Sequence, residues 1–184
     1  MAVAYRLFQA RFGPCDPTGA RLRGGRWSSP GQDILYASDS LALCCLEVLV
    51  HIRDTRFVPS FEYCAINIPD DLIGVWPLQH SDPRHTAILQ SPVLSQEFGD
   101  GFLRMNANLE GAVDADYVVA DGPAEGSLLV REWPWLPVQA VPSVVIPDSF
   151  NFLIDPNHER FRELVWHVPH VFEFEPRLLN PDLR

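Results

Sequence analysis

The sequence predicts a single domain of the α+β class, with mixed or antiparallel strands and a few helices. Segments with the composition of strands outnumber segments with helical periodicity, and the two kinds do not alternate strictly, as they would in a doubly wound sheet. A chain of 184 residues is long enough to bury its own core. No internal repeat or linker-like stretch divides it. We therefore expect one domain over residues 1–184.

The first part of the chain predicts three strands and one capped helix. Three segments have the alternating or apolar character of short strands, at residues 3–12, 33–37 and 61–68. Residues 13–25 are rich in glycine and proline and predict turns. Residues 41–51 predict an apolar helix, with Asp39 or Ser40 as its N-cap.

The second part of the chain predicts mostly short strands. They are expected at residues 72–76, 117–120, 128–131, 138–146, 151–154 and 171–175. Residues 77–92 are polar and predict a loop. Residues 93–105 predict a helix that Gly99-Asp100-Gly101 interrupts, and residues 159–166 predict a short amphipathic helix.

The charge pattern excludes some function classes and favours a small anionic ligand. A formal net charge of −10 argues against nucleic-acid binding, which requires a basic face. All 14 basic residues are arginine, so Schiff-base and P-loop lysines are absent. Residues 1–26 contain five arginines and one acid, and arginine forks onto phosphate in two-point contacts. Within this segment we expect Arg6 and Arg11 to be merely solvated surface residues.

Other residue types predict a protein of a reducing compartment without a metal. The four cysteines form no C-x-x-C pair and are expected to be reduced thiols that fill the core. The histidines lack acidic or cysteine companions at ligand spacing, so no metal is expected. The chain starts without a charged-then-apolar leader and has no apolar run long enough to span a bilayer, which predicts a soluble, cytoplasmic protein without a membrane partner.

Glu47 is the most informative residue of the predicted helix at 41–51. It is the only charge there before Arg53, and burial of a carboxylate without partners is costly. One reading makes Glu47 functional. The other places Glu47, His51 and Asp54 on one wet helix face, since they are spaced i, i+4 and i+7. Spacing alone leaves the two readings equal.

Two residues upstream suit a nicotinamide dinucleotide when combined with Glu47. Arg26 follows two glycines and precedes Trp27, and could hold a pyrophosphate. Tyr36 ends the strand before the helix, and its ring could stack on nicotinamide. The carboxylate would orient a ribose hydroxyl and face the positive charge that develops as the glycosidic bond breaks. Nicotinamide leaves as a neutral group, so one carboxylate suffices where ordinary glycosidases use two.

The stretch GGRWSSPGQDILYASDSLALCCLEVLVH at residues 24–51 resembles the RES domain family, in the order and spacing of its arginine, tyrosine and glutamate. The segment Val141-Pro142-Ser143 is similar to the V-P-S segment of that family. Residues 151–158 resemble its N-x-L-x-N-P-x-H tail, and residues 99–103 resemble its G-D-x-W-L helix more weakly. The resemblance covers about residues 5–162 and leaves 163–184 as a C-terminal extension.

The resemblance implies a toxin of a bacterial toxin–antitoxin pair, with a fold similar to that of ADP-ribosyltransferase toxins. Such a toxin depletes NAD, its substrate, by hydrolysis or by phosphorolysis with inorganic phosphate. Some members of the family are ADP-ribosyltransferases that modify a protein. The implied partner is an Xre-type antitoxin that blocks the active site. By carry-over, the catalytic residues are Arg26, Tyr36, Glu47 and Ser143, and the NAD-binding residues are Arg26, Trp27, Tyr36 and Ser143.

Departures from the family pattern leave a second class of function open. Ser28 stands where asparagine is common in the family, and Asp155 replaces the asparagine before Pro156. The segment 106–137 is longer than the family leads us to expect, and it contains Trp133 and Trp135. This long segment and its tryptophans leave open a non-catalytic module that keeps the fold and binds a protein. The serine between Pro142 and Val144 has the weakest support from the residues alone.

Overall fold

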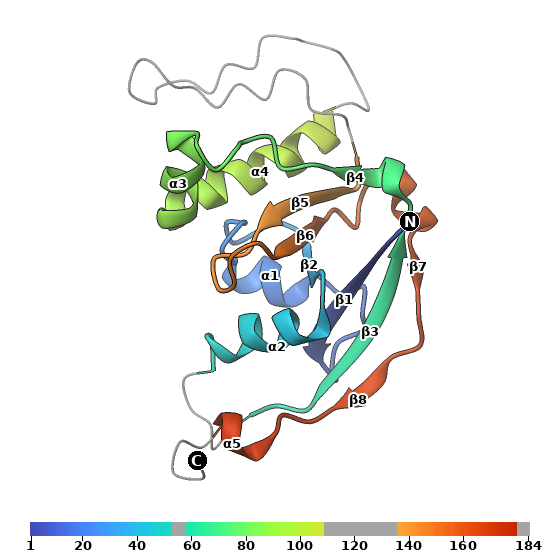
Figure 1. The fold of residues 1–184 in the computed structure, drawn as a ribbon. Helices are drawn as coiled ribbons and strands as arrows, with labels where there is room; N and C mark the ends of the chain where they lie inside the picture. Colours follow the sequence, from blue (N-terminus) through green and yellow to red (C-terminus); the bar gives the residue numbers. More distant parts are fainter. Residues whose placement is uncertain (53–57, 109–135, 180–184) are drawn as a thin grey trace.

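One mixed sheet dominates the computed structural model, which describes residues 1–52, 58–108 and 136–179 (Figure 1). Within these residues the strand order is β4-β5-β6-β2-β1-β3-β7, and β8 also pairs with β3. Only β4 and β5 are parallel, and every other pair is antiparallel. The strands are β1 (Ala2–Gln9), β2 (Leu35–Ser38), β3 (Phe61–Ile68), β4 (Ile73–Gly74), β5 (Val138–Pro142), β6 (Phe150–Ile154), β7 (Val165–Trp166) and β8 (His170–Phe172).

Five α-helices and two 3-10 helices accompany the sheet in the described part of the chain. The helices are α1 (Thr18–Arg23), α2 (Leu41–Leu49), η2 (Asp70–Leu72), α3 (Pro83–Gln90), α4 (Pro92–Asn108), η3 (Glu159–Glu163) and α5 (Pro176–Leu179). Figure 1 shows α3 and α4 beside β5, and α2 beside β1 and β2. None of these helices is long and apolar enough to cross a membrane.

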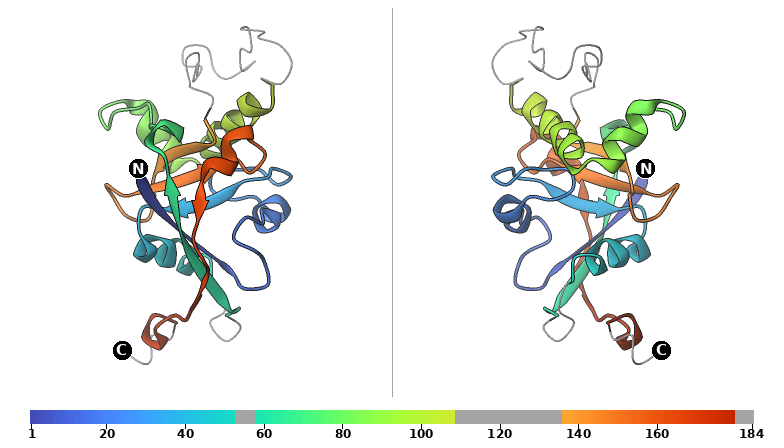
Figure 2. Two further views of the ribbon diagram at one scale, coloured as in Figure 1. Left: turned by 90° about the vertical axis from the view of Figure 1, so that its right-hand side faces the viewer. Right: turned by 90° about the vertical axis from the view of Figure 1, so that its left-hand side faces the viewer.

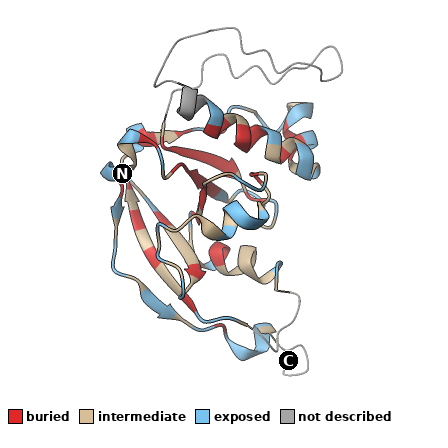
Figure 3. Cartoon of the chain, turned by 180° about the vertical axis from the view of Figure 1, so that it is seen from behind, coloured by how far each residue is buried: buried red, intermediate tan, exposed pale blue. Residues whose placement is uncertain are grey.

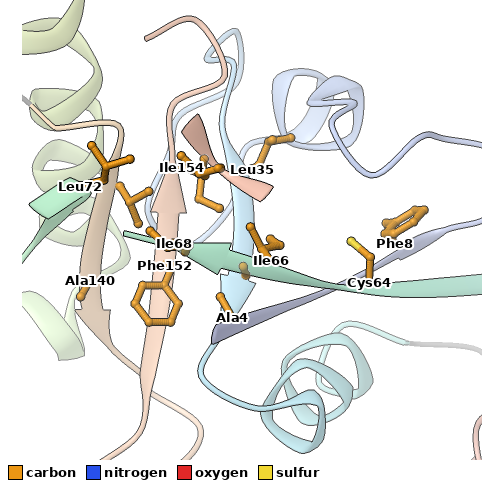
Figure 4. Packing of buried hydrophobic residues seen from close by; sticks show 13 residues of the cluster. Ala4, Phe8, Leu35, Cys64, Ile66, Ile68, Leu72, Ala140, Phe152 and Ile154 are labelled. Carbon is orange, nitrogen blue, oxygen red and sulfur yellow. The ribbon is translucent and has the colours of Figure 1, made fainter. Parts of the chain in front are cut away.

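The sheet curls around the first of two hydrophobic clusters. Figure 2 shows β5 and β6 running across the direction of β3, so that the two parts of the sheet face each other. Alternate residues of the strands point inward, which is the two-residue period expected of a strand. Ala4, Leu35, Ile66, Phe152 and Ile154 are among the buried members of this cluster (Figure 4).

The opposite sheet face is covered at two places by helices. Near β5 and β6, aromatic side chains from α4 and from the loops form a second buried cluster with Leu153 and Val141. Figure 3 shows buried positions on α4 and on the strands, while α1 and β8 are mainly exposed. At the second place, α2 lies on β1, where the Cys44 thiol donates to the Tyr5 carbonyl (2.9 Å). Polar residues of β2 and β6 lie on this face between the two covered regions.

The α+β prediction and most strands of the first half are confirmed. The third strand has the predicted bounds, 61–68, and Ser40 is the N-cap of α2, with its hydroxyl accepting from Leu43 N (3.2 Å). Shorter strands than expected form near 33–37, 72–76, 138–146 and 171–175. The strands expected at 117–120 and 128–131, and nearly all of the long segment at 106–137, lie outside the described residues.

Four expectations about helices are wrong. The expected turn segment 13–25 contains α1. The expected loop 77–92 contains α3, since Asp82 caps that helix through Arg84 N (2.8 Å) and Pro83 suits its first turn. Helix α4 is continuous through Gly99 and Gly101. Residues 159–166 do not form one helix, because Val165 and Trp166 pair with β3.

Candidate active site

Helix α2 places Glu47 beside the polar side chains of β2 and β6. The helix begins at the Ser40 cap directly after β2, so its position is tied to the end of that strand. Its side chains are apolar except for Glu47, which is half-buried. A carboxylate in this position needs polar partners, because desolvation would otherwise disfavour it.

Glu47 receives two hydrogen bonds from distant parts of the chain. Ser143 Oγ donates to Glu47 Oε1 (2.8 Å), and Asn151 Nδ2 donates to the same oxygen (2.6 Å). Asn151 in turn accepts from Ser38 Oγ through its Oδ1 (2.7 Å). Ser38 and Asn151 are paired across β2 and β6, and both side chains are buried. The sheet therefore brings α2, β2, β6 and the loop after β5 to one carboxylate.

Ser143 follows β5 and is held by its own turn. Its hydroxyl accepts from the backbone N–H groups of Val145 (3.0 Å) and Ile146 (3.1 Å) and donates to Glu47. Its own N–H donates to the Ser149 carbonyl (2.8 Å). A serine hydroxyl has one donor and two acceptor sites. The protein itself occupies all three, and the side chain is buried.

Tyr36 connects β2 to the turn that contains Arg26. Its hydroxyl shares a hydrogen bond with Ser28 Oγ (2.8 Å). A Cβ on Gly25 would lie 2.6 Å from the Tyr36 hydroxyl oxygen, so only glycine allows this approach of backbone to ring. Burial raises the pKa of Tyr36 to about 12, although the Ser28 hydrogen bond opposes that shift. The phenol is therefore neutral at physiological pH.

Replacement of Tyr36 by phenylalanine is expected to cost stability in a pH-dependent way. At pH 8 the loss of the bond to buried Ser28 lowers the free energy of unfolding by about 1–2 kcal/mol. The pKa of Tyr36 is raised in the folded state, so the stability that tyrosine gives over phenylalanine is complete below pH 10. As pH rises towards 12, this difference in unfolding free energy falls by about 2 kcal/mol. Urea unfolding of both proteins from pH 8 to 12 measures this. A stability difference that grows with pH would contradict the assignment.

Arg26 lies in the turn between α1 and β2 and contacts the end of α3. One of its terminal nitrogens donates to the Leu89 carbonyl. Its Nε is buried and has no hydrogen-bond partner within the described part of the chain. The turn is held by α4, since Gln96 Nε2 donates to the Gly25 carbonyl (3.0 Å). The guanidinium is thus anchored at one N–H and retains donors for an anion.

Trp27 lies in the second hydrophobic cluster and not among the polar side chains of β2 and β6. Its ring is 2% exposed and packs edge-on against Trp76 and Phe98, with centroids 5.8 and 5.7 Å away. The Trp27 backbone lies against Gly99 of α4. This burial gives Trp27 a packing role, through which it fixes the turn carrying Arg26.

Two expectations about individual side chains outside the Glu47 group are wrong. Arg6 is not a solvated surface residue, because it donates to the carbonyls of Tyr36 (3.0 Å) and Asp16 (3.1 Å) and burial lowers its pKa to about 10. It holds β2 and the α1 loop in place. Cys15 is exposed and does not fill the core. Arg11 is exposed as expected.

The structure brings the predicted residues together in two groups. Glu47 contacts Ser143 directly, while Tyr36 contacts the turn of Arg26, and β2 links the two groups. Of the residues that share a predicted helix face with Glu47, His51 is exposed and Asp54 lies outside the described residues. Sequence reasoning did not assign Asn151 to the site. Its position at the start of the family-like tail is the one signal in the sequence that could have found it.

Potential metal ligands do not gather near this site. Among residues 1–52, 58–108 and 136–179, no three histidine, cysteine, aspartate or glutamate side chains form a group that could hold a metal ion. Burial raises the pKa of the Cys44 thiol to about 11, so this neighbour of Ser38 on α2 is no nucleophile at neutral pH.

Comparison with protein families and with characterised proteins gives consistent matches. The RES domain family model matches residues 3–114. A protein called Toxin Res from Yersinia enterocolitica is 30% identical, over 96% of this chain and 99% of its own length. A Prs ADP-ribosylating toxin from Sphingobium sp. is 25% identical, over 88% of this chain and 84% of its own.

A solved structure has the same fold. A chain of the Mycobacterium tuberculosis MbcT–MbcA toxin–antitoxin complex superimposes with a TM-score of 0.60, over 97% of this chain and 86% of that one. The two sequences are 15% identical, so the likeness concerns the fold alone. The arrangement of strands and helices described above therefore occurs in an experimentally determined structure.

Proposed function

This chain belongs to the RES domain family, and we propose that it is a toxin that consumes NAD by cleaving the bond between nicotinamide and ribose. The observation that carries the proposal is the fixed carboxylate of Glu47, which is held on one oxygen by Ser143 and Asn151. Cleavage of this bond builds positive charge on the ribose. A carboxylate fixed beforehand stabilises that charge without reorganisation during the reaction.

The other residues of the site have distinct roles in this proposal. Arg26 binds the pyrophosphate with the donors that the Leu89 carbonyl does not use. Tyr36 offers its ring to the nicotinamide or its ribose and is oriented by Ser28. Nicotinamide departs as a neutral molecule, so no general acid is needed. The neutral phenol of Tyr36 is then a contact surface and not a proton donor.

The group that attacks the ribosyl cation defines the final product. Water gives hydrolysis, inorganic phosphate gives phosphorolysis, and a nucleophilic side chain of another protein gives ADP-ribosyl transfer. The Sphingobium relative is named an ADP-ribosylating toxin, which favours protein transfer as the alternative to be tested. All three reactions share the bond cleavage beside Glu47.

We also propose an antitoxin as the protein partner. The structural neighbour was determined as a toxin–antitoxin complex. The resemblance to the family favours an Xre-type antitoxin as the partner of this chain. Such a partner would protect the producing cell, where the toxin meets NAD in the cytoplasm.

Product analysis of the purified protein with NAD tests the proposal. We expect release of free nicotinamide, with ADP-ribose as co-product in the absence of phosphate or a phosphorylated ADP-ribose in its presence. Chromatography and mass spectrometry identify each product, and a labelled adenine moiety on a protein would identify transfer. No nicotinamide release with water, phosphate or a candidate protein acceptor would overturn the enzyme proposal and favour a non-catalytic binding module.

A further inference from the structure

We propose that Asn151, held by Ser38, is a positioning residue that commits Oε1 of Glu47 to the protein and leaves Oε2 to face the substrate. The inference rests on the proposed function and deepens it, since it names the reacting oxygen and the device that selects it. It also makes Ser143 a positioning residue and not a group that contacts NAD.

The protein uses the two carboxylate oxygens of Glu47 unequally. Both hydrogen bonds to Glu47 end on Oε1, from Ser143 Oγ at 2.8 Å and Asn151 Nδ2 at 2.6 Å. No hydrogen bond to Oε2 is found from any residue in the three described ranges. Two donors, one from the turn after β5 and one from β6, fix the position of Oε1. Oε2 is the oxygen with lone pairs still available.

The side chain of residue 151 is of a type that can connect Ser38 to Glu47. Asparagine carries a donor and an acceptor on one planar group. Its acceptor receives Ser38 Oγ, at 2.7 Å, and this bond turns the amide so that Nδ2 faces Glu47. Ser38 and Asn151 are register partners across β2 and β6, so the sheet sets the geometry of the relay. A buried relay with every member satisfied is rigid.

The hydroxyl of Ser143 is bound entirely by the protein. Its two acceptor sites take the N–H groups of Val145 and Ile146, and its proton goes to Glu47. No hydrogen-bonding capacity remains for a ligand. The turn after β5 thus supplies one donor to Oε1, and the Ser38–Asn151 relay supplies the other.

An asparagine-to-aspartate change tests the relay through pH. In Asn151→Asp a second carboxyl group lies next to Oε1, and two adjacent carboxylates cannot both ionise easily. At pH 8 we expect kcat for NAD consumption to fall about 10- to 100-fold, the effect of losing one hydrogen bond to a charged group. The fall in kcat should become smaller towards pH 5, because the two carboxyl groups then share one proton, which forms a hydrogen bond between them. KM for NAD should change little, because Arg26 and Tyr36 are intact.

Three controls separate positioning from a general structural effect. Asn67→Asp makes the same chemical change on β3, two strands away from β2, and should leave the pH profile unaltered. Ser38→Ala should lower kcat without the recovery at low pH, since it frees the amide and adds no carboxyl group. Circular dichroism verifies that each variant is folded.

A measurement on Glu47 without NAD separates this inference from the proposed function. Carbon-13 NMR of labelled glutamate follows the titration of Glu47 in the wild type and in Asn151→Asp. We expect the variant to titrate at higher pH than the wild type. If the wild type fails to consume NAD but this shift occurs, the function is wrong and the relay stands as a structural contact. If the titration of Glu47 is the same in Asn151→Asp as in the wild type, or if the fall in kcat is independent of pH, the proposed relay is wrong even if NAD is consumed.

Discussion

Replacement of Glu47 by glutamine is expected to lower kcat for NAD consumption by at least about a hundredfold, the size of effect seen when one preorganised electrostatic group is removed. The change removes the negative charge that faces the ribosyl cation and retains nearly the same shape. Affinity for NAD should remain within a few-fold of the wild type, because Arg26 and Tyr36 are unchanged. Initial rates of nicotinamide release, together with calorimetric binding of NAD, measure the two effects separately.

A matched substitution on another helix controls for the loss of one charge. Glu97 is an exposed glutamate of α4, a helix that contributes no hydrogen bond to Glu47 in the described part of the chain. The Glu97→Gln variant should retain wild-type activity. Equal rates for the wild type and the Glu47→Gln variant would show that the carboxylate does not participate in bond cleavage.

The Gly99→Ala variant is expected to lose more than about 3 kcal/mol of unfolding free energy, above the usual range for an overpacked position. A Cβ at this position would lie 1.8 Å from the Trp27 carbonyl oxygen, which is backbone and cannot rotate away. Helix α4 would have to move from the turn of residues 25–29. Its hydrogen bonds to that turn, from Gln96 to Gly25 O and from Ser29 N to Asp100, would be strained. Urea denaturation measures the loss.

Gly101, two residues further along the same helix, provides the comparison. A Cβ there meets nothing within 4 Å. Because alanine is a better helix former than glycine, Gly101→Ala should raise the unfolding free energy by about 0.5–1 kcal/mol. NAD consumption should fall only in Gly99→Ala, since only that variant displaces Arg26. Equal stability of the two variants would contradict the packing described for Trp27.

The local features of the site were predictable because they depend on neighbouring residues. The Ser40 cap and the isolated carboxylate of α2 are visible as a short pattern in the chain. The strand at 61–68 is long, and Pro69 ends it. Such features need no knowledge of the tertiary structure.

The remaining features depend on contacts between distant residues. Asn151 meets Glu47 only because β6 pairs with β2, and no spacing along the chain reveals that pairing. Gly99 and Gly101 suggested a break in α4, but Gly99 is required there by close packing against Trp27. The sequence does not reveal that Arg6 is held inside the protein, because its acceptors are backbone carbonyls, which have no signature in the sequence.

The most direct measurement is a crystal structure of the Glu47→Gln variant with NAD bound. We expect the nicotinamide ribose to lie beside residue 47, on the side of the amide nitrogen that replaces Oε2, because Ser143 and Asn151 donate to the amide oxygen. The pyrophosphate should lie at Arg26, and the nicotinamide or ribose against Tyr36. Ser143 and Asn151 should lie behind the side chain and should not touch the ligand. NAD bound elsewhere, or with its glycosidic bond away from residue 47, would contradict the central claim.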